Sequence, residues 1–129
     1  MITALRIISG LFGLLFGISF LNWLLAPAAA AEMLGMPLLD GVGRNTQIGD
    51  FTAFFFTLTV LIGAGLWRRQ AEPLFIACLL LGSAALFRLL AALLHDATLA
   101  PVSVGVEVVA SVVLLAYARC LPRGQAPKG

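Results

Sequence analysis

Charged residues are scarce in this chain. Of its 129 residues only 11% are aspartate, glutamate, lysine or arginine, whereas 61% are hydrophobic and the mean hydropathy is +1.06. A soluble domain of this size needs more polar groups to cover its surface, so the composition indicates an integral membrane protein. The formal net charge of +2 is too small to support nucleic-acid binding. The first expected partner is therefore the lipid bilayer.

Residues that bind metals or form disulfides are equally few. The chain has one histidine, His95, and two cysteines, Cys78 and Cys120, which lack Cys-x-x-C spacing. A single histidine excludes bis-histidine haem ligation, and His95 beside Asp96 is too small a set to predict a metal site. No serine or cysteine has a histidine partner at its expected membrane depth. We predict no catalytic residues, metal or cofactor, and interpret both cysteines as packing residues.

Long apolar segments dominate what is present. Each is close to the roughly twenty residues that a membrane-spanning helix requires, and they cover about residues 3–26, 46–67, 73–94 and 101–121. The sequence therefore predicts an all-α fold, an integral membrane four-helix bundle that forms one domain over residues 1–121. The Pro/Gly-rich tail over residues 122–129 is predicted to be disordered.

Basic residues gather at one side of the predicted bundle. Arg44 alone lies at the other set of helix ends, whereas six lie at the side of both termini: Arg6, Arg68, Arg69, Arg119, Arg123 and Lys128. The positive-inside rule therefore predicts both termini in the cytoplasm (N-in, C-in). The first span also resembles a cleavable signal peptide, because it ends in Ala-Pro-Ala-Ala-Ala-Ala. Its apolar run is longer than a signal core of about 7–15 residues, which favours retention over cleavage.

Two local patterns concern how the first helices are built. Pro27 and Gly35 bracket an apolar stretch and predict a short extracytoplasmic helix over residues 28–34, with Asn45 or Thr46 as the cap at the start of helix two. Asp50 would then lie one turn in, where it complements the helix dipole. Small residues at four-residue spacing on the first helix predict packing within the bundle, with homodimerisation as the alternative: Ser9, Gly13 and Gly17.

The third span carries one charge, Arg88. An arginine near a helix centre costs about 2.5–3.5 kcal/mol on an insertion scale, whereas the leucines, isoleucine and phenylalanines of residues 74–94 return about 4–7 kcal/mol. The helix should insert, with Arg88 pointing into the protein toward a carboxylate. The best candidate is Glu107, the only acid well inside another apolar segment.

One polar residue from each span is expected at a similar depth in the outer leaflet. Helical rise places Arg88 about 10 Å, Glu107 about 9 Å, Asn22 about 7 Å and Asp50 about 6 Å from the outer ends of their helices. His95 is seven residues from Arg88 and shares its helix face. These five residues could form a buried structural network, or a polar pocket that recognises the head of an apolar ligand.

A family resemblance rests on these same positions. Arg6 before a glycine-rich helix, Gly43-Arg44-Asn45 followed by Asp50, and then Arg88 and Glu107 together resemble small bacterial four-helix membrane proteins of unknown function, similar to the DoxX-like group. The resemblance implies a multi-pass protein of the bacterial cytoplasmic (inner) membrane. DoxX-like relatives include subunits associated with thiosulfate:quinone oxidoreduction, which implies a quinone or redox-complex connection.

Three functional hypotheses follow. The first is a non-enzymatic accessory or scaffold subunit, in which Arg88 and Glu107 fix helix register and the partner is a membrane complex or another copy of the chain. The second is a binding or transport module for a lipid- or quinone-like ligand in an outer-leaflet pocket. The third is a membrane enzyme that uses Glu107 or Asp50 as an acid or base.

Overall fold

The computed structural model describes residues 1–122, and these fold into helices joined by short connections. The helices are α1 (Ile2–Leu25), α2 (Pro27–Met33), α3 (Gly41–Arg68), α4 (Ala71–His95) and α5 (Pro101–Cys120). All except α2 are long and apolar enough to cross a membrane. The predicted all-α four-helix bundle with a short additional helix is therefore confirmed. The predicted tail, apart from Pro122, lies outside the described residues.

Local sequence signals explain the short helix. Pro27 occupies the first turn of α2, where its missing N–H loses no hydrogen bond. Gly35 follows the helix in the left-handed conformation (φ 72°), and the Met36 backbone N–H donates to the Ala31 carbonyl at 3.0 Å. This pairing is a common helix C-cap and favours glycine at the left-handed position. Pro27 and Gly35 therefore lie at the start and just after the end of α2, as predicted.

The start of α3 differs from the prediction. The helix begins at Gly41, not at Asn45 or Thr46, and its N-cap, Asp40, makes no side-chain capping bond. Asp50 consequently lies about 13 Å along the helix, well beyond the first turn. Its predicted role as a dipole partner was wrong, because α3 begins with an additional turn, residues 41–45, that precedes its apolar segment.

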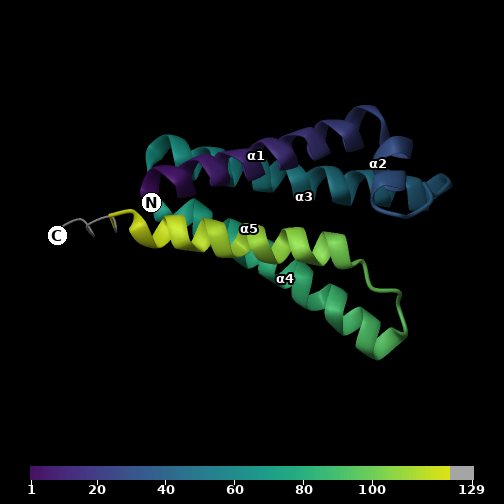
Figure 1. Cartoon of the computed structure of the whole chain (residues 1–129). Coiled ribbons are helices and arrows are strands. Elements are labelled where there is room, and N and C mark those ends of the chain that lie inside the picture. Colours follow the sequence, from purple (N-terminus) through teal and green to yellow (C-terminus); the bar gives the residue numbers. More distant parts are fainter. Residues whose placement is uncertain (123–129) are drawn as a thin grey trace, which may run out of the picture.

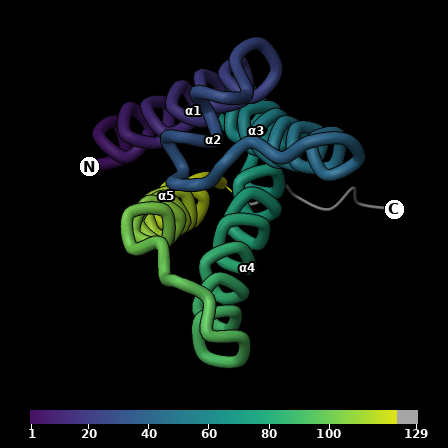
Figure 2. Tube along the Cα trace, turned by 90° about the vertical axis from the view of Figure 1, so that its right-hand side faces the viewer, coloured from purple at the N-terminus to yellow at the C-terminus, as the bar shows by residue number. Residues whose placement is uncertain are grey.

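The helices form two antiparallel pairs that meet along the bundle axis. Figures 1 and 2 show α1 beside α3 and α4 beside α5. The N-terminus and the end of α5 lie at one end, which we call the basic end because Arg6, Arg68, Arg69 and Arg119 are there. The opposite end holds α2 and residues 96–100, and we call it the loop end. Toward the loop end, α4 leans away from the rest of the bundle (Figure 2).

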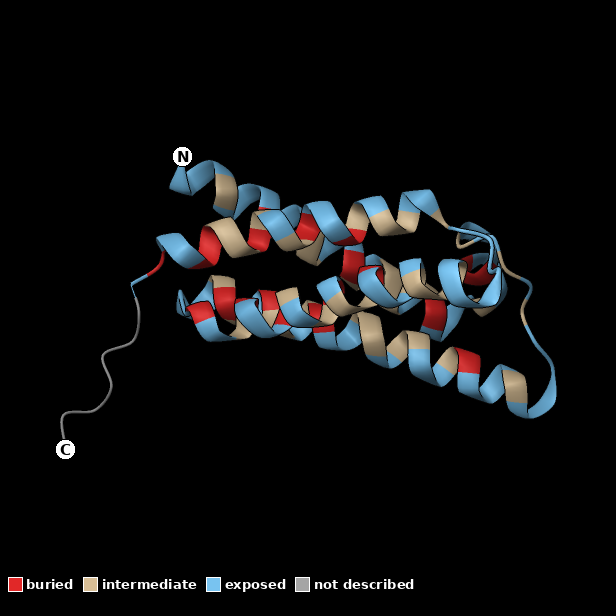
Figure 3. Ribbon diagram, turned by 90° about the horizontal axis from the view of Figure 1, so that it is seen from below, coloured by how far each residue is buried: buried red, intermediate tan, exposed pale blue. Residues whose placement is uncertain are grey.

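The bundle core is narrow and faces inward. Figure 3 shows buried positions confined to the facing sides of the helices, while most of the outer surface is exposed. The first helix contributes its small residues: a Cβ at Gly13 would lie 3.0 Å from Ile62, and one at Gly17 would lie 3.5 Å from Thr59. The predicted packing of this face within the bundle is therefore confirmed. The central core cluster includes Phe16, Leu58, Ile62, Leu74, Leu81, Leu114 and Tyr117.

Close packing at the basic end depends on Gly65. A Cβ at this position would lie 2.6 Å from two atoms of the buried Leu74 side chain and 3.3 Å from the Gln70 carbonyl. We expect Gly65→Ala to lower the free energy of unfolding by about 1–3 kcal/mol through overpacking. Gly63→Ala is the matched control, because a Cβ there meets nothing within 4 Å. It should be neutral or slightly stabilising, since alanine favours helix. Unfolding by SDS in mixed micelles measures both; equal stability of the two variants contradicts the prediction.

Candidate functional site

The centre of the site is an ion pair between the last two spanning helices. Arg88 Nε on α4 donates to Glu107 Oε1 on α5 at 3.0 Å. The Glu107 side chain is only 7% exposed, whereas that of Arg88 is 30% exposed. The short connection over residues 96–100 returns the chain antiparallel, so both residues come to the same level. The predicted pairing of Arg88 with Glu107 is therefore confirmed.

The pair leaves hydrogen-bonding capacity unused. Within residues 1–122, Arg88 bonds Glu107 through Nε alone, so its two Nη groups have no protein acceptor. Glu107 Oε2 is buried and has no partner, and the same holds for the hydroxyl of Ser111, one turn further along α5. Buried polar atoms are normally satisfied, so each such exception requires an explanation. The charges cancel, but donors and an acceptor remain available.

A mostly apolar cavity of about 350 Å³ adjoins this pair. Its volume is in the range typical of small-molecule sites, which combine apolar walls with a few polar groups. The polar side chains on its wall belong to Ser19, Arg88, Ser103 and Glu107. Its apolar lining comes from α1, the end of α2, α3 and the start of α5: Leu15, Phe16, Met33, Leu34, Phe54, Phe55, Ala100, Pro101, Val102 and Val106.

A second groove of about 430 Å³ lies between α3 and α4. Arg88 and Phe54 line both spaces, so these two residues lie between the cavity and the groove. Asp50 lines the groove and is exposed. The remaining lining is apolar and consists of Phe51, Ala84, Phe87 and Ala91. The site is thus centred on Arg88, which borders two mostly apolar spaces. Glu107 lines the cavity and Asp50 lines the groove.

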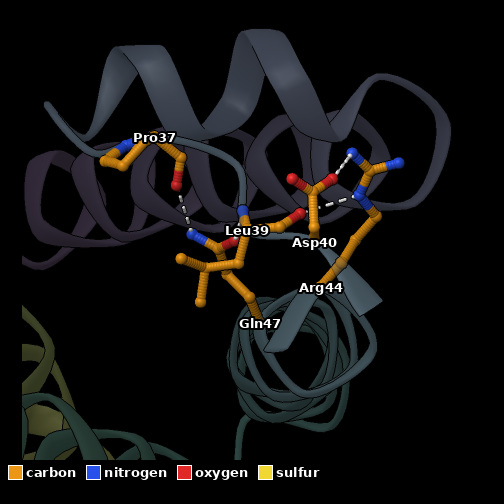
Figure 4. Close-up of polar contacts among 5 residues, drawn as sticks. All are labelled: Pro37, Leu39, Asp40, Arg44 and Gln47. Atoms are coloured by element: carbon orange, nitrogen blue, oxygen red, sulfur yellow. Dashed lines mark hydrogen bonds and ion pairs between the residues drawn. The ribbon is translucent and has the colours of Figure 1, made fainter. Parts of the chain in front are cut away.

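The segment around α2 covers one end of the cavity. It is held by Trp23, which is 1% exposed and stacks on Phe51 with ring centroids 4.5 Å apart. Gln47 anchors the following loop (Figure 4): its Oε1 accepts the Leu39 N–H at 2.9 Å, and its Nε2 donates to the Pro37 carbonyl at 3.1 Å.

The loop is also tied to the start of α3. Arg44 Nη2 lies 2.8 Å from Asp40 Oδ1, and Arg44 Nε donates to the Leu39 carbonyl at 2.8 Å (Figure 4). These contacts fix the chain that presents Met33, Leu34 and Gly35 to the cavity. The wall of the cavity is therefore built in part by residues outside the spanning segments.

The other predicted site residues are distributed differently. Asn22 lines a small space of about 90 Å³ beside Trp23, which shares Ser19, Met33, Leu34 and Phe55 with the lining of the cavity but not Arg88 or Glu107. His95 is exposed at the end of α4. Among residues 1–122 neither Asn22 nor His95 makes a hydrogen bond to Arg88 or Glu107. The structure thus joins Arg88 and Glu107 directly, places Asp50 on the adjoining groove, and leaves Asn22 and His95 apart from the pair.

Sequence reasoning missed Gln47 and Ser19. Gln47 is buried, with three polar contacts to the loop over residues 36–39, and its isolated amide near an apolar segment was the available signal. Ser19 gives no comparable signal, because its hydroxyl already donates to the Leu15 carbonyl at 3.0 Å. Comparisons with known protein families, curated proteins and solved structures found no significant match, so the assignment of function depends on this geometry.

Proposed function

We propose that the protein is a membrane-embedded binding module for an amphipathic molecule whose polar head contacts Arg88 and whose apolar part occupies the adjoining cavity. The observation that carries the proposal is the incomplete hydrogen bonding of the Arg88–Glu107 pair at the wall of an apolar space. Intramembrane ionisable residues commonly mark ligand or ion sites. Taken with the positive-inside rule, the loop-end cavity would open in the outer leaflet of a bacterial cytoplasmic membrane.

The chemistry of the head follows from the charges. Arg88 and Glu107 already neutralise each other, so an anionic head would compete with Glu107 and a cationic head with Arg88. An uncharged head that accepts hydrogen bonds can use the free Nη groups without displacing the pair. Hydroxyl-bearing lipids and quinone-like molecules both belong to this class. Rearrangement of the carboxylate would let a hydroxyl donate to Glu107 as well.

An accessory or scaffold role is the alternative. It is favoured by the same neutralisation, since a pair that cancels its own charge can fix helix register without a ligand. The resemblance to DoxX-like proteins fits either role. The two roles predict different results for a variant that blocks the cavity and keeps the ion pair. Ligand binding should fall only if the cavity is a binding site.

Blocking the cavity mouth tests the proposed function. Val102 lines the cavity and is 79% exposed, so Val102→Trp should fill space there without entering the core. We expect native mass spectrometry of detergent-solubilised protein to show monoolein binding, an uncharged hydroxyl-bearing probe, that weakens at least tenfold in Val102→Trp. Oleic acid and oleylamine should bind more weakly than monoolein to the unmodified chain.

The control is Val112→Trp on the same helix. Val112 is 61% exposed and lines neither the cavity nor the groove, so this variant should bind monoolein as the unmodified chain does. Equal binding by both tryptophan variants, or no monoolein binding at all, would reject the cavity as the site and leave the scaffold role.

A further inference from the structure

A different cavity lies at the basic end of the bundle, remote from the Arg88 site. It has a volume of about 220 Å³ and is formed where the start of α1, the α3–α4 turn and the end of α5 meet. The N-terminus and the end of α5 lie close together there in Figure 1. Its lining consists of Ile2, Thr3, Arg6, Arg69, Tyr117, Leu121 and Pro122.

Two of these lining residues are arginines from distant parts of the sequence. Arg6 belongs to α1, and Arg69 belongs to the two-residue turn between α3 and α4. The ion pairs within residues 1–122 are Arg44–Asp40 and Arg88–Glu107, so neither of these arginines is paired there. Glu72, the one acid of that part of the chain at this end, pairs with neither. Among the described residues, the two arginine charges at this cavity therefore have no ion-pair partner.

The backbone at Arg69 is unusual for an arginine. Arg69 caps α3 in the left-handed conformation (φ 52°, ψ 46°), and the following Gln70 N–H donates to the Gly65 carbonyl at 3.2 Å. Helix ends of this type favour glycine, because a Cβ is crowded in that conformation. The position instead carries a long cationic side chain that lines the cavity. The close approach of Leu74 to Gly65 holds the turn in place.

The other lining residues combine one hydrogen-bonding side chain with apolar ones, which suits a ligand that has both a phosphate and an acyl chain. Tyr117 is 1% exposed and belongs to the core cluster, and it lines the cavity together with Arg6 and Arg69. Ile2 and Leu121 add apolar surface. Arginine binds phosphate through parallel N–H···O bonds, and a tyrosine hydroxyl can donate a further one.

We propose that this cavity is a binding site for a phosphate-bearing anion, with Arg6 and Arg69 as its ligands. The site is independent of the proposed function, because it shares no residue with the Arg88 cavity. Two sources supply the same chemistry, an anionic lipid headgroup and a soluble phosphate. The apolar lining favours the lipid, and the experiment distinguishes the two.

The test uses the full chain in a neutral detergent, titrated with dioleoyl phosphatidylglycerol, with dioleoyl phosphatidylcholine, or with inorganic phosphate, and followed by native mass spectrometry. We expect Arg6→Gln and Arg69→Gln each to weaken phosphatidylglycerol binding at least fivefold. Arg68→Gln and Arg119→Gln remove the same charge at the same end but lie outside the cavity, so they should change it less than twofold. Binding of inorganic phosphate with the same dependence on Arg6 and Arg69 would support the site and identify a soluble ligand.

Arg69→Gly separates binding from folding. Glycine accepts the left-handed conformation, so this variant should unfold at the same or higher SDS concentration than the unmodified chain, yet lose phosphatidylglycerol binding as Arg69→Gln does. Val102→Trp should leave this binding unchanged. Equal losses in all four arginine-to-glutamine variants would show general attraction to a basic surface and overturn the proposal. So would full phosphatidylglycerol binding by Arg69→Gly.

Discussion

Arg88→Leu alone is expected to lower the free energy of unfolding by about 3–5 kcal/mol, because it leaves the carboxylate of Glu107 buried without its cation. Arg88→Leu combined with Glu107→Leu should fold within about 1 kcal/mol of the unmodified chain, since apolar replacements of a buried pair are often neutral. With Glu107→Leu alone these variants complete a double-mutant cycle, and the change in the double variant minus the sum of the two single changes, measured by SDS unfolding, gives the coupling energy of the pair.

The double variant also distinguishes the two candidate functions. If the pair serves only to fix helix register, the well-folded double variant should retain whatever monoolein binding the unmodified chain has. If the pair contacts the ligand head, that binding should fall at least tenfold despite normal stability. Single and double variants of equal instability would contradict the energetic coupling of Arg88 and Glu107.

Trp23→Ala is expected to lower the stability by a similar amount, but the loss of structure should be confined to α2 and its loop. Trp23 is buried and stacked on Phe51, so its truncation should cost about 3–5 kcal/mol through lost burial and an unfilled cavity. Because Ala30 and Ala31 of α2 pack in the same cluster, the change should release α2 before the spanning helices. Hydrogen exchange of residues 27–40 should therefore accelerate more than that of α4 or α5.

Trp67→Ala is the control for Trp23→Ala. Trp67 is 88% exposed at the end of α3, so its removal should change the stability in micelles by less than about 0.5 kcal/mol. Since Met33 of α2 lines the 350 Å³ cavity, Trp23→Ala should also weaken monoolein binding. Uniform acceleration of exchange along the whole chain would show that Trp23 supports the entire bundle rather than α2.

The fold was predictable from the sequence because hydrophobic length sets the number of spans. The Arg88–Glu107 pair was predictable for a related reason, since an ionised group inside an apolar segment needs an opposite charge. The start of α3 was not, because residues 41–45 lie outside the apolar segment from which the helix was predicted. In the structure these residues are helical, and Gln47 and Arg44 bond the preceding residues 37–40.

The extent of the site was harder to predict than its centre. Helical rise gives the depth of a residue but not its direction around the bundle, so Asn22 lies near the expected level and lines a different space. The groove beside Arg88 lies between α3 and α4, and α4 leans away from the bundle at this end (Figure 2), an angle that depends on packing between particular side chains. Hydropathy alone carries no information on such angles.

The tight packing of Leu74 against Gly65 makes this contact the pivot about which α4 would tilt at the basic end. Arg88 lies fourteen residues beyond Leu74, about 21 Å along the helix at 1.5 Å per residue. A rigid rotation of α4 by about 5° around this pivot would move Arg88 sideways by about 2 Å. A change in the tilt of α4 at the basic end would therefore alter the width of the groove between α3 and α4 at the level of Arg88.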